Sequence, residues 1–269
     1  MCEEMRTLPT GRERLVRVLE QAGDVVRIDD VVTVLGVGRS EASKRLSRWK
    51  EQGWLRRVGS GAYISVPLDM LDAEQVLDDP WVLVPHLFSP CYVGGWTAAE
   101  HWDLTEQLFR STFVCTARSI RSGDVHRQGM VFDLRRVQEH HIFGTRTVWR
   151  RNTKVQVADI HRTVIDMLNN PAWGGGIDHV SECLDRYAGK RDFAPDKLLQ
   201  YADRLDNGAL HKRLGFLAEL KGLQSLADQC HSRLTKGYAR LDPDLECAHL
   251  VTRWRLWVPR DWKERTESL

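Results

Sequence analysis

Residues Arg39–Val66 have the sequence RSEASKRLSRWKEQGWLRRVGSGAYISV, which indicates how the first part of the chain folds. Apolar residues recur in its first half at i, i+4 and i+7, at Ala42, Leu46 and Trp49. This spacing predicts a helix with one buried face. Ser40 is the expected N-cap residue, and Gly53 is expected to stop the helix after Gln52.

The opposite face of this predicted helix is basic and hydroxylic. At about 100° per residue, Ser40, Lys44, Ser47 and Arg48 project away from the apolar face, with Arg45 on a flank. Lysine and arginine side chains reach guanine edges and phosphates when a helix lies in the major groove. We therefore expect this face to meet double-stranded DNA.

A β-hairpin is predicted directly after this helix. Two β-prone runs within residues 54–66 flank Gly59-Ser60-Gly61, a sequence typical of a tight turn. Arg56 and Arg57 stand at the base of the hairpin, and a glycine-rich tip lets backbone amides approach phosphate.

Two further helices are predicted upstream of Arg39. Residues 12–22 carry an apolar stripe and end at Gly23, and a shorter helix runs from its expected N-cap, Asp29, to Gly36. Three helices followed by a hairpin predict a winged helix-turn-helix over residues 1–68.

The charge pattern supports a nucleic-acid partner for this segment. Residues 39–57 hold seven basic and two acidic side chains, a local charge of +5 in a chain whose net charge is +2. The predicted DNA-binding residues are Arg39, Ser40, Lys44, Arg45, Ser47, Arg48, Arg56, Arg57 and Ser60. The alternative is a winged helix that binds protein, with its charged face only solvated.

The composition is that of a globular protein. The 269 residues suggest two domains, and 42% of them are hydrophobic. The sequence has no run of 18 apolar residues and no apolar signal segment at its start. Its six cysteines are scattered without a CxxC motif, as expected for reduced thiols in a cytoplasmic protein.

The rest of the sequence predicts a connector over residues 69–85 and a mixed α/β C-terminal domain over residues 86–269. Together with the winged helix, this domain makes the predicted fold class α+β. Thr97 is the expected N-cap of a helix, and further helices are expected from Asp159 onward. Strands are predicted at 112–116, 129–132, 141–143, 147–149 and 154–157, and helices at 160–168, 178–187, 195–205, 208–220 and 223–234. A last β-prone run covers 253–259, so the domain ends in helices and a strand.

No local motif predicts catalysis, and we expect no enzyme activity, no cofactor and no metal. His179 and Cys183 lie at i, i+4 and could share a zinc ion, but two partners are missing from any familiar spacing. A buried thiol explains Cys183 more simply. The segment Gly174-Gly175-Gly176 lacks a following Lys-Ser/Thr and is not a P-loop.

A second basic stretch has two interpretations. Its members, without an acidic neighbour between them, are Arg146, Arg150, Arg151 and Lys154. They form either a solvated face or a second nucleic-acid contact surface.

The order of several motifs resembles the AbiEi antitoxin family. The segment Val157–Leu168, VADIHRTVIDML, is similar to the family's "ADxxRTxID" stretch. The other similar segments are Pro171 with Gly174–Ile177, Lys197–Ala202, Lys212–Leu217, Leu241–Pro243 and Trp254–Trp257. Within the first motif, we expect Arg162 to pair with an acidic side chain in a structural role. Thr163 has no nearby base in the sequence and is not expected to be a nucleophile.

This resemblance implies a function in a type IV toxin–antitoxin, or abortive-infection, system of phage defence. Members repress their own promoter by binding inverted repeats through the N-terminal domain. Their C-terminal domain counters an AbiEii-type nucleotidyltransferase toxin, usually without a stable complex. The competing hypotheses are a protein-interaction module and a nucleic-acid-processing enzyme that the winged helix targets to its substrate.

Overall fold

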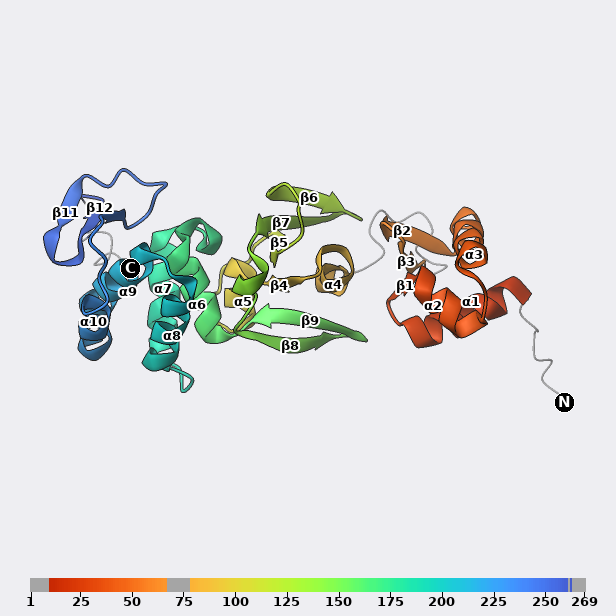
Figure 1. Cartoon of the computed structure of the whole chain (residues 1–269), viewed down its shortest axis with the longest axis horizontal. Helices are drawn as coiled ribbons and strands as arrows, with labels where there is room; N and C mark the ends of the chain where they lie inside the picture. Colours follow the sequence, from red (N-terminus) through yellow and green to blue (C-terminus); the bar gives the residue numbers. More distant parts are fainter. Residues whose placement is uncertain (1–9, 67–77, 261, 263–269) are drawn as a thin grey trace.

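The computed structural model describes residues 10–66, 78–260 and 262. A winged-helix end, a mixed sheet, a group of helices and a small C-terminal sheet follow one another along the long axis (Figure 1). The chain is therefore α+β, as predicted. Within the described ranges, no helix is long and apolar enough to cross a membrane.

The N-terminal part consists of three helices and a three-stranded antiparallel sheet in the order β1-β3-β2. Its elements are α1 (Thr10–Ala22), β1 (Val25–Arg27), α2 (Ile28–Leu35), α3 (Arg39–Glu51), β2 (Leu55–Gly59) and β3 (Ala62–Ser65). Gly36 and Gly53 adopt φ values of 62° and 74°, the left-handed conformation expected where a helix stops. Strand β1 is missing from the sequence prediction.

Two predicted helix caps in this part are wrong. Helix α2 begins at Ile28, and the backbone N–H of its cap residue Arg27 donates to the Asp30 carboxylate at 2.6 Å. Asp29 therefore lies inside the first turn. Helix α3 begins one residue before Ser40, because Gly38 has the extended backbone (φ −68°, ψ 156°) of a cap residue.

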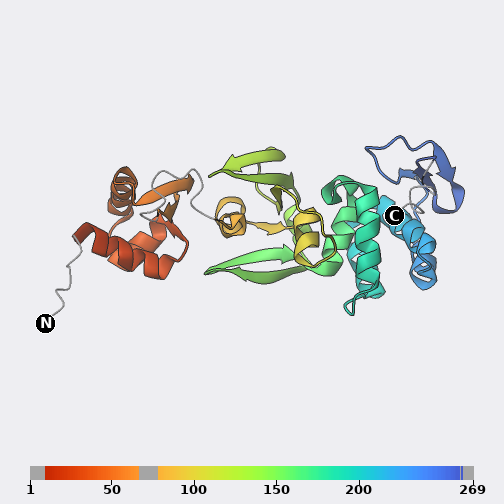
Figure 2. The same ribbon diagram turned by 180° about the vertical axis from the view of Figure 1, so that it is seen from behind.

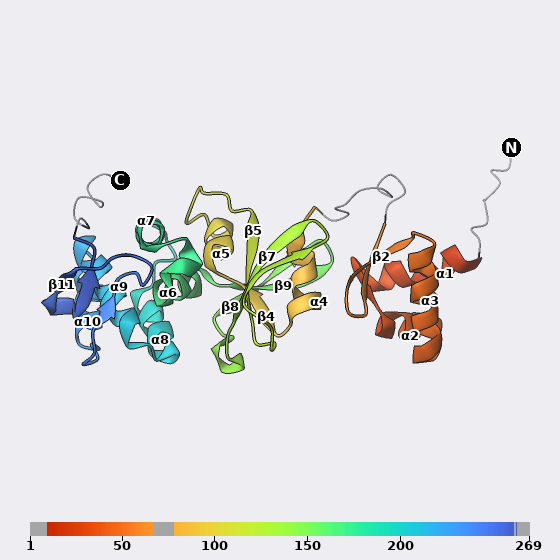
Figure 3. The ribbon, with the colours of Figure 1, turned by 90° about the horizontal axis from the view of Figure 1, so that it is seen from above.

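A six-stranded mixed sheet with the order β6-β7-β5-β4-β9-β8 forms the middle of the molecule. Its strands are β4 (Cys91–Val93), β5 (Ser111–Thr116), β6 (Gly123–Arg127), β7 (Met130–Arg136), β8 (Thr145–Arg150) and β9 (Thr153–Ala158). The pairs β4–β9 and β5–β7 are parallel, and the other pairs are antiparallel. The turns of the β6–β7 and β8–β9 hairpins point toward the winged-helix end (Figures 1 and 3).

Three short helices flank this sheet. The 3-10 helix η2 (Pro80–Leu83) and helix α4 (Val84–Phe88) lie between the sheet and the winged-helix end, whereas α5 (Gly95–His101) lies toward the C-terminal helices. Thr97 sits inside α5, whose cap residue is Gly94, so the predicted Thr97 cap is wrong. The Thr97 hydroxyl instead accepts the backbone N–H of Phe113 at 2.8 Å and ties α5 to β5.

The predicted strand at 141–143 is also wrong. The chain there forms the 3-10 helix η3 (Glu139–His141) and turns at Gly144 (φ 62°). Phe143 does not pair with a neighbouring strand. Its ring packs instead against that of Tyr201, with a centroid distance of 5.4 Å. Burial of this one aromatic ring outweighs the weak strand preference of three residues.

The C-terminal part is mainly helical (Figure 2). Its helices are α6 (Ile160–Asn169), η4 (Pro171–Gly174), α7 (Ile177–Ala188), α8 (Pro195–Leu205), α9 (Gly208–Leu220) and α10 (Gln224–His231). A small sheet with the order β10-β12-β11 follows, formed by β10 (Ala239–Arg240), β11 (His249–Val251) and β12 (Leu256–Val258), with η5 (Thr252–Trp254) before β12. The bounds of α8 and α9 coincide with the prediction.

The hydrophobic core links the winged helix to the middle sheet. Val25, Val58 and Ile64 belong to the same buried cluster as Trp81 and Val82 of η2. Residues 80–85 of the predicted connector are thus packed structure, whereas its residues 69–77 lie outside the described residues. One face of the small N-terminal sheet is consequently covered by the rest of the chain.

Candidate nucleic-acid interface

Helix α3 presents one buried and one exposed face. Ala42, Leu46 and Trp49 are at most 3% exposed and pack in the core of the winged helix with α1 and α2. Burial of these side chains fixes the rotation of the helix about its axis. The predicted outward residues Ser40, Lys44, Ser47 and Arg48 are all exposed, so the predicted orientation of the helix is confirmed.

Two of the predicted arginines on α3 are paired with carboxylates. Arg39 contacts Asp29 at 2.5 Å, and both side chains are 72% exposed. Arg45 contacts Glu41 at 2.9 Å, one helical turn away. The Arg39–Asp29 pair is exposed on both sides, and such pairs are weak and exchange readily with other partners. Across the described part of the chain, Lys44, Arg48 and Lys50 of α3 form no ion pair. Of these three, Lys44 and Arg48 belong to the outward face predicted to meet DNA.

The predicted wing residues occupy strand β2 and its turn. Arg57 is exposed, and its Nε donates to the Gly59 carbonyl at 3.0 Å, across a register shift in the β2–β3 ladder. Ser60 is exposed in the turn, while Arg56 is half-buried. Gly61 adopts φ 67° there, which a side-chain-bearing residue adopts only with strain.

The wing also touches the middle of the molecule. The Nε2 of Gln128, in the turn between β6 and β7, donates to the Arg57 carbonyl at 3.1 Å. A Cβ atom at Gly59 would collide with the side chain of Leu87 in α4. The end of β2 is therefore held against the β6–β7 turn and α4.

Polar contacts at two further places join the winged helix to the sheet. Nη2 of Arg27 donates to the His86 carbonyl at 2.6 Å. The Asp24 carboxylate accepts the Asn152 N–H at 3.2 Å and the Thr153 hydroxyl at 3.4 Å. Burial, and next the Arg27 guanidinium, lower the pKa of His86. Sequence reasoning missed this interface because its partners are far apart in the chain and follow no local motif.

The second basic stretch is divided between the two faces of the β8–β9 hairpin. Arg146 and Arg150 pair across the hairpin with Val157 and Thr153, whereas Lys154 pairs with Trp149. Cross-strand partners share a face and successive residues alternate. Arg146 and Arg150 thus lie on one face and Lys154 on the other, and the structure does not gather them on one surface.

The surroundings of these basic residues also differ. The Arg150 guanidinium stacks over Trp81 at 4.3 Å and lies 3.9 Å from Asp79. Arg151, in the turn, lies 3.7 Å from Asp78. Lys154 is exposed beside Trp149, with its Nζ 5.1 Å from the ring centroid. A contact of nucleic acid with any of these four residues remains a prediction.

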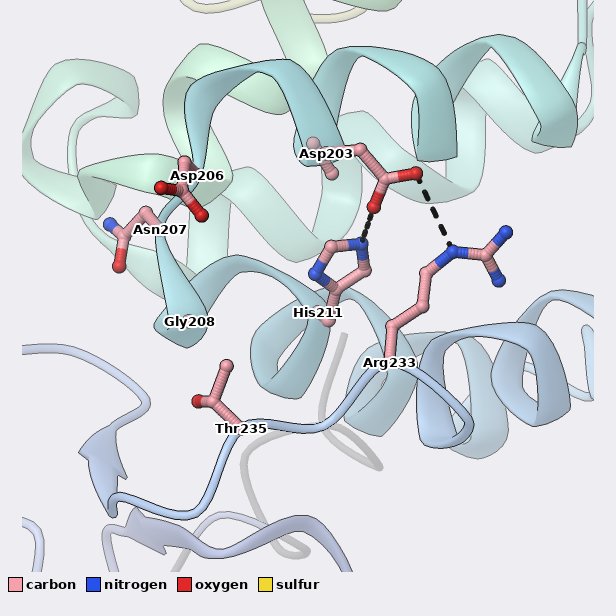
Figure 4. A pocket seen from close by; sticks show the side chains of 8 residues that line it. Asp203, Asp206, Asn207, Gly208, His211, Arg233 and Thr235 are labelled. Atoms are coloured by element: carbon pink, nitrogen blue, oxygen red, sulfur yellow. Dashed lines mark ion pairs between the residues drawn. The ribbon is translucent and has the colours of Figure 1, made fainter.

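A polar pocket of about 290 Å³ lies between α8, α9 and the segment after α10 (Figure 4). The Asp203 carboxylate lies 3.0 Å from Nε2 of His211 and 3.5 Å from Nε of Arg233. Burial lowers the pKa of His211, and Asp203 opposes that shift. The two oxygens of Asp203 contact a side chain of α9 and a side chain in the segment after α10, so the arrangement joins α8 to both.

The histidine and cysteine predicted as a weak zinc candidate do not form a metal site in the described residues. The His179 Nε2 lies 2.7 Å from the Thr105 hydroxyl and 3.7 Å from the Cys183 sulfur, and its Nδ1 contacts the Gly174 carbonyl. Both ring nitrogens therefore have protein partners. No group of three or more metal-ligating side chains occurs among the residues described.

Comparison with known proteins finds a sequence match for the N-terminal segment and a fold match for nearly the whole chain. Residues 13–66, which span α1 to β3, match the family model described as "Transcriptional regulator, AbiEi antitoxin". The fold is similar to the crystal structure of RV2827C protein from Mycobacterium tuberculosis, with a TM-score of 0.64 over 94% of this chain and 92% of that chain. At 14% identity this likeness concerns the fold alone. No curated protein matches the sequence.

Proposed function

We propose that this protein is a DNA-binding antitoxin that represses its own operon and counteracts an AbiEii-like nucleotidyltransferase toxin. The observation that carries the proposal is the exposed basic face of α3 in a segment that matches a family of transcriptional regulators. A helix with a fixed apolar side and an uncompensated basic side suits the major groove of DNA.

The residues divide into two roles in this proposal. Lys44 and Arg48 reach base edges, because they are the long basic side chains of the outward face that have no ion pair. Ser40 and Ser47 add short polar contacts. The wing residues Arg56, Arg57 and Ser60, together with Arg39 and Arg45, contact backbone phosphates. Inverted repeats are then read by two copies of the chain, since the symmetry of an operator mirrors that of the bound protein.

Gel shifts with the DNA upstream of its own gene test the DNA-binding role. The double variant Lys44→Ala/Arg48→Ala is expected to lose about 1–3 kcal/mol of binding free energy for each base contact removed. The matched control, Lys236→Ala/Arg240→Ala, removes the same charge from two exposed residues at the opposite end of the molecule. Equal affinity of the two double variants would contradict the role assigned to α3.

Toxin neutralisation is tested separately, by co-expression with the AbiEii-like nucleotidyltransferase that the proposal places in the same operon. The wild-type protein is expected to restore growth, and the α3 double variant is expected to restore growth while failing to repress an operon reporter. Neutralisation survives the loss of repression in this variant if neutralisation depends on residues 86–269. Growth arrest that persists with the wild-type protein would refute the antitoxin part of the proposal.

A further inference from the structure

The turn of the β6–β7 hairpin lies against the wing. Gln128 in this turn has φ 54° and is followed by Gly129 with φ 74°, and its side-chain amide donates to the Arg57 carbonyl at 3.1 Å. The contact joins residues 71 positions apart in the chain. From this junction we infer that the β6–β7 hairpin acts as a second wing, which extends the DNA interface by a phosphate contact from Arg127.

The hairpin, the wing and α3 lie on the same side of the molecule. Helix α3, strand β2 and strand β6 occupy the upper side in Figure 1, and they follow one another along its long axis. The view from above shows β2 between α3 and the hairpin (Figure 3). A duplex that enters at α3 and passes the wing therefore reaches the hairpin next.

Arg127 stands at the end of the hairpin that meets the wing. It pairs across the ladder with Met130, the first residue of β7, and so shares a face with Met130 and Phe132. Phe132 on this face packs against Phe88 of α4 at a centroid distance of 5.3 Å. The Arg127 side chain itself is exposed, because the core ends at Met130. The face of Arg127 is therefore the one on which α4 packs, next to the wing.

The charges of Arg127 and Arg57 are both available to a phosphate. Nη1 of Arg127 donates to the His126 carbonyl at 2.7 Å, and Nε of Arg57 donates to the Gly59 carbonyl at 3.0 Å. Neither arginine forms an ion pair within residues 10–66 and 78–260. A carbonyl partner orients a guanidinium without neutralising it, so the two exposed cations are held in place at one junction.

This inference rests on the proposed DNA-binding function and deepens it. The backbone of DNA is the same for every sequence, so a phosphate contact adds affinity without adding specificity. The logarithm of the binding constant falls linearly with the logarithm of the salt concentration, and each neutralised phosphate steepens this slope by about 0.9 for duplex DNA. The contribution of Arg127 is therefore measurable as a change of slope.

The test compares Arg127→Ala with Arg136→Ala in salt titrations of binding to the upstream DNA. Arg136 is also exposed, but it lies at the far end of β7, about 20 Å from the turn at roughly 3.3 Å per residue. Arg127→Ala is expected to weaken binding to operator and unrelated DNA alike and to reduce the slope by about 1. Arg136→Ala and the charge-conserving Arg127→Lys are expected to keep the wild-type slope.

Two outcomes separate this inference from the proposal beneath it. If the wild-type protein binds no duplex, the DNA-binding function itself fails. If the wild-type protein binds and Arg127→Ala keeps the slope of Arg136→Ala, the second wing is refuted while the role of α3 stands. Binding is then measured with successively shorter duplexes. The length at which Arg127→Ala and the wild-type protein bind with equal affinity shows how far along the DNA the contact with Arg127 lies.

Discussion

Among single residues, a buried ion pair stands out in the interior of the C-terminal part. Arg162 and Asp166 are each 1% exposed, and their Nε and Oδ1 atoms lie 2.8 Å apart. The Tyr92 hydroxyl donates to Asp166 at 2.9 Å and accepts from Arg162 at 3.1 Å. Burial raises the pKa of Asp166, and Arg162 opposes that shift. The expected acidic partner of Arg162 is confirmed, and the three residues join α6 to β4.

Asp166→Ala is expected to lower the free energy of unfolding by about 3–5 kcal/mol, because it leaves the Arg162 charge buried without a partner. Urea denaturation measures the change. Glu106→Ala is the control, since it breaks an exposed pair with Arg186 whose atoms lie 3.0 Å apart. Unfolding of both variants at the same urea concentration would contradict the structural role assigned to Arg162.

At the scale of elements, helix α9 shows how packing overrides intrinsic preference. Gly215 lies in the middle of this helix, where alanine is ordinarily more favourable by about 1 kcal/mol. A Cβ atom at this position would lie 2.8 Å from the Cβ of Cys230 and would also collide with the Trp254 ring. Glycine is retained here because α9 approaches α10 and η5 closely.

Gly215→Ala is therefore expected to destabilise the protein by about 1–3 kcal/mol in thermal or urea unfolding, despite the gain in helix propensity. The control is Gly189→Ala, at the end of α7, where φ is −80° and a Cβ atom would lie no closer than 3.7 Å to its nearest neighbour. A stabilising effect of Gly215→Ala would mean that the packing around Trp254 is looser than described.

The sequence predicts strongly periodic elements well and short ones poorly. The bounds of α8 and α9 follow from apolar spacing and from Pro195 at a helix start. Strands β1 and β6 were missed, because β1 has three residues between two helices and β6, GDVHR, has one large apolar side chain. Such strands form because a neighbouring strand pairs with them.

The same contrast holds for the candidate interface. The outward face of α3 follows from about 100° of rotation per residue, so Lys44 and Arg48 were predictable. The contact between Gln128 and Arg57 was not, because it depends on how the hairpin and the wing meet in space.

In the whole molecule, the winged helix and the sheet share a core, and burial lowers the pKa of several histidines. Five of the ten histidines in the sequence have a pKa lowered mainly by burial: His86, His101, His141, His161 and His211. The unfolded chain takes up protons at these rings at a higher pH than the folded chain does.

The free energy of unfolding is therefore expected to fall as the pH drops below about 6.5, the usual pKa of an exposed histidine. Urea denaturation at pH 7.5 and pH 5.5 measures the fall. His211→Gln is expected to reduce it, whereas His126→Gln, at an exposed position on β6, is expected to leave it unchanged. Equal falls in wild type and His211→Gln would contradict the role given to burial of this ring.

Methylation protection of guanine N7 shows whether the exposed face of α3 reads bases in the major groove. N7 lies in the major groove, where a bound lysine or arginine shields it. With wild-type protein on the DNA upstream of its own gene, guanines in an inverted repeat are expected to be protected, and Lys44→Ala/Arg48→Ala is expected to abolish that protection. Guanines that stay fully reactive under bound wild-type protein would contradict base reading by α3 in the major groove.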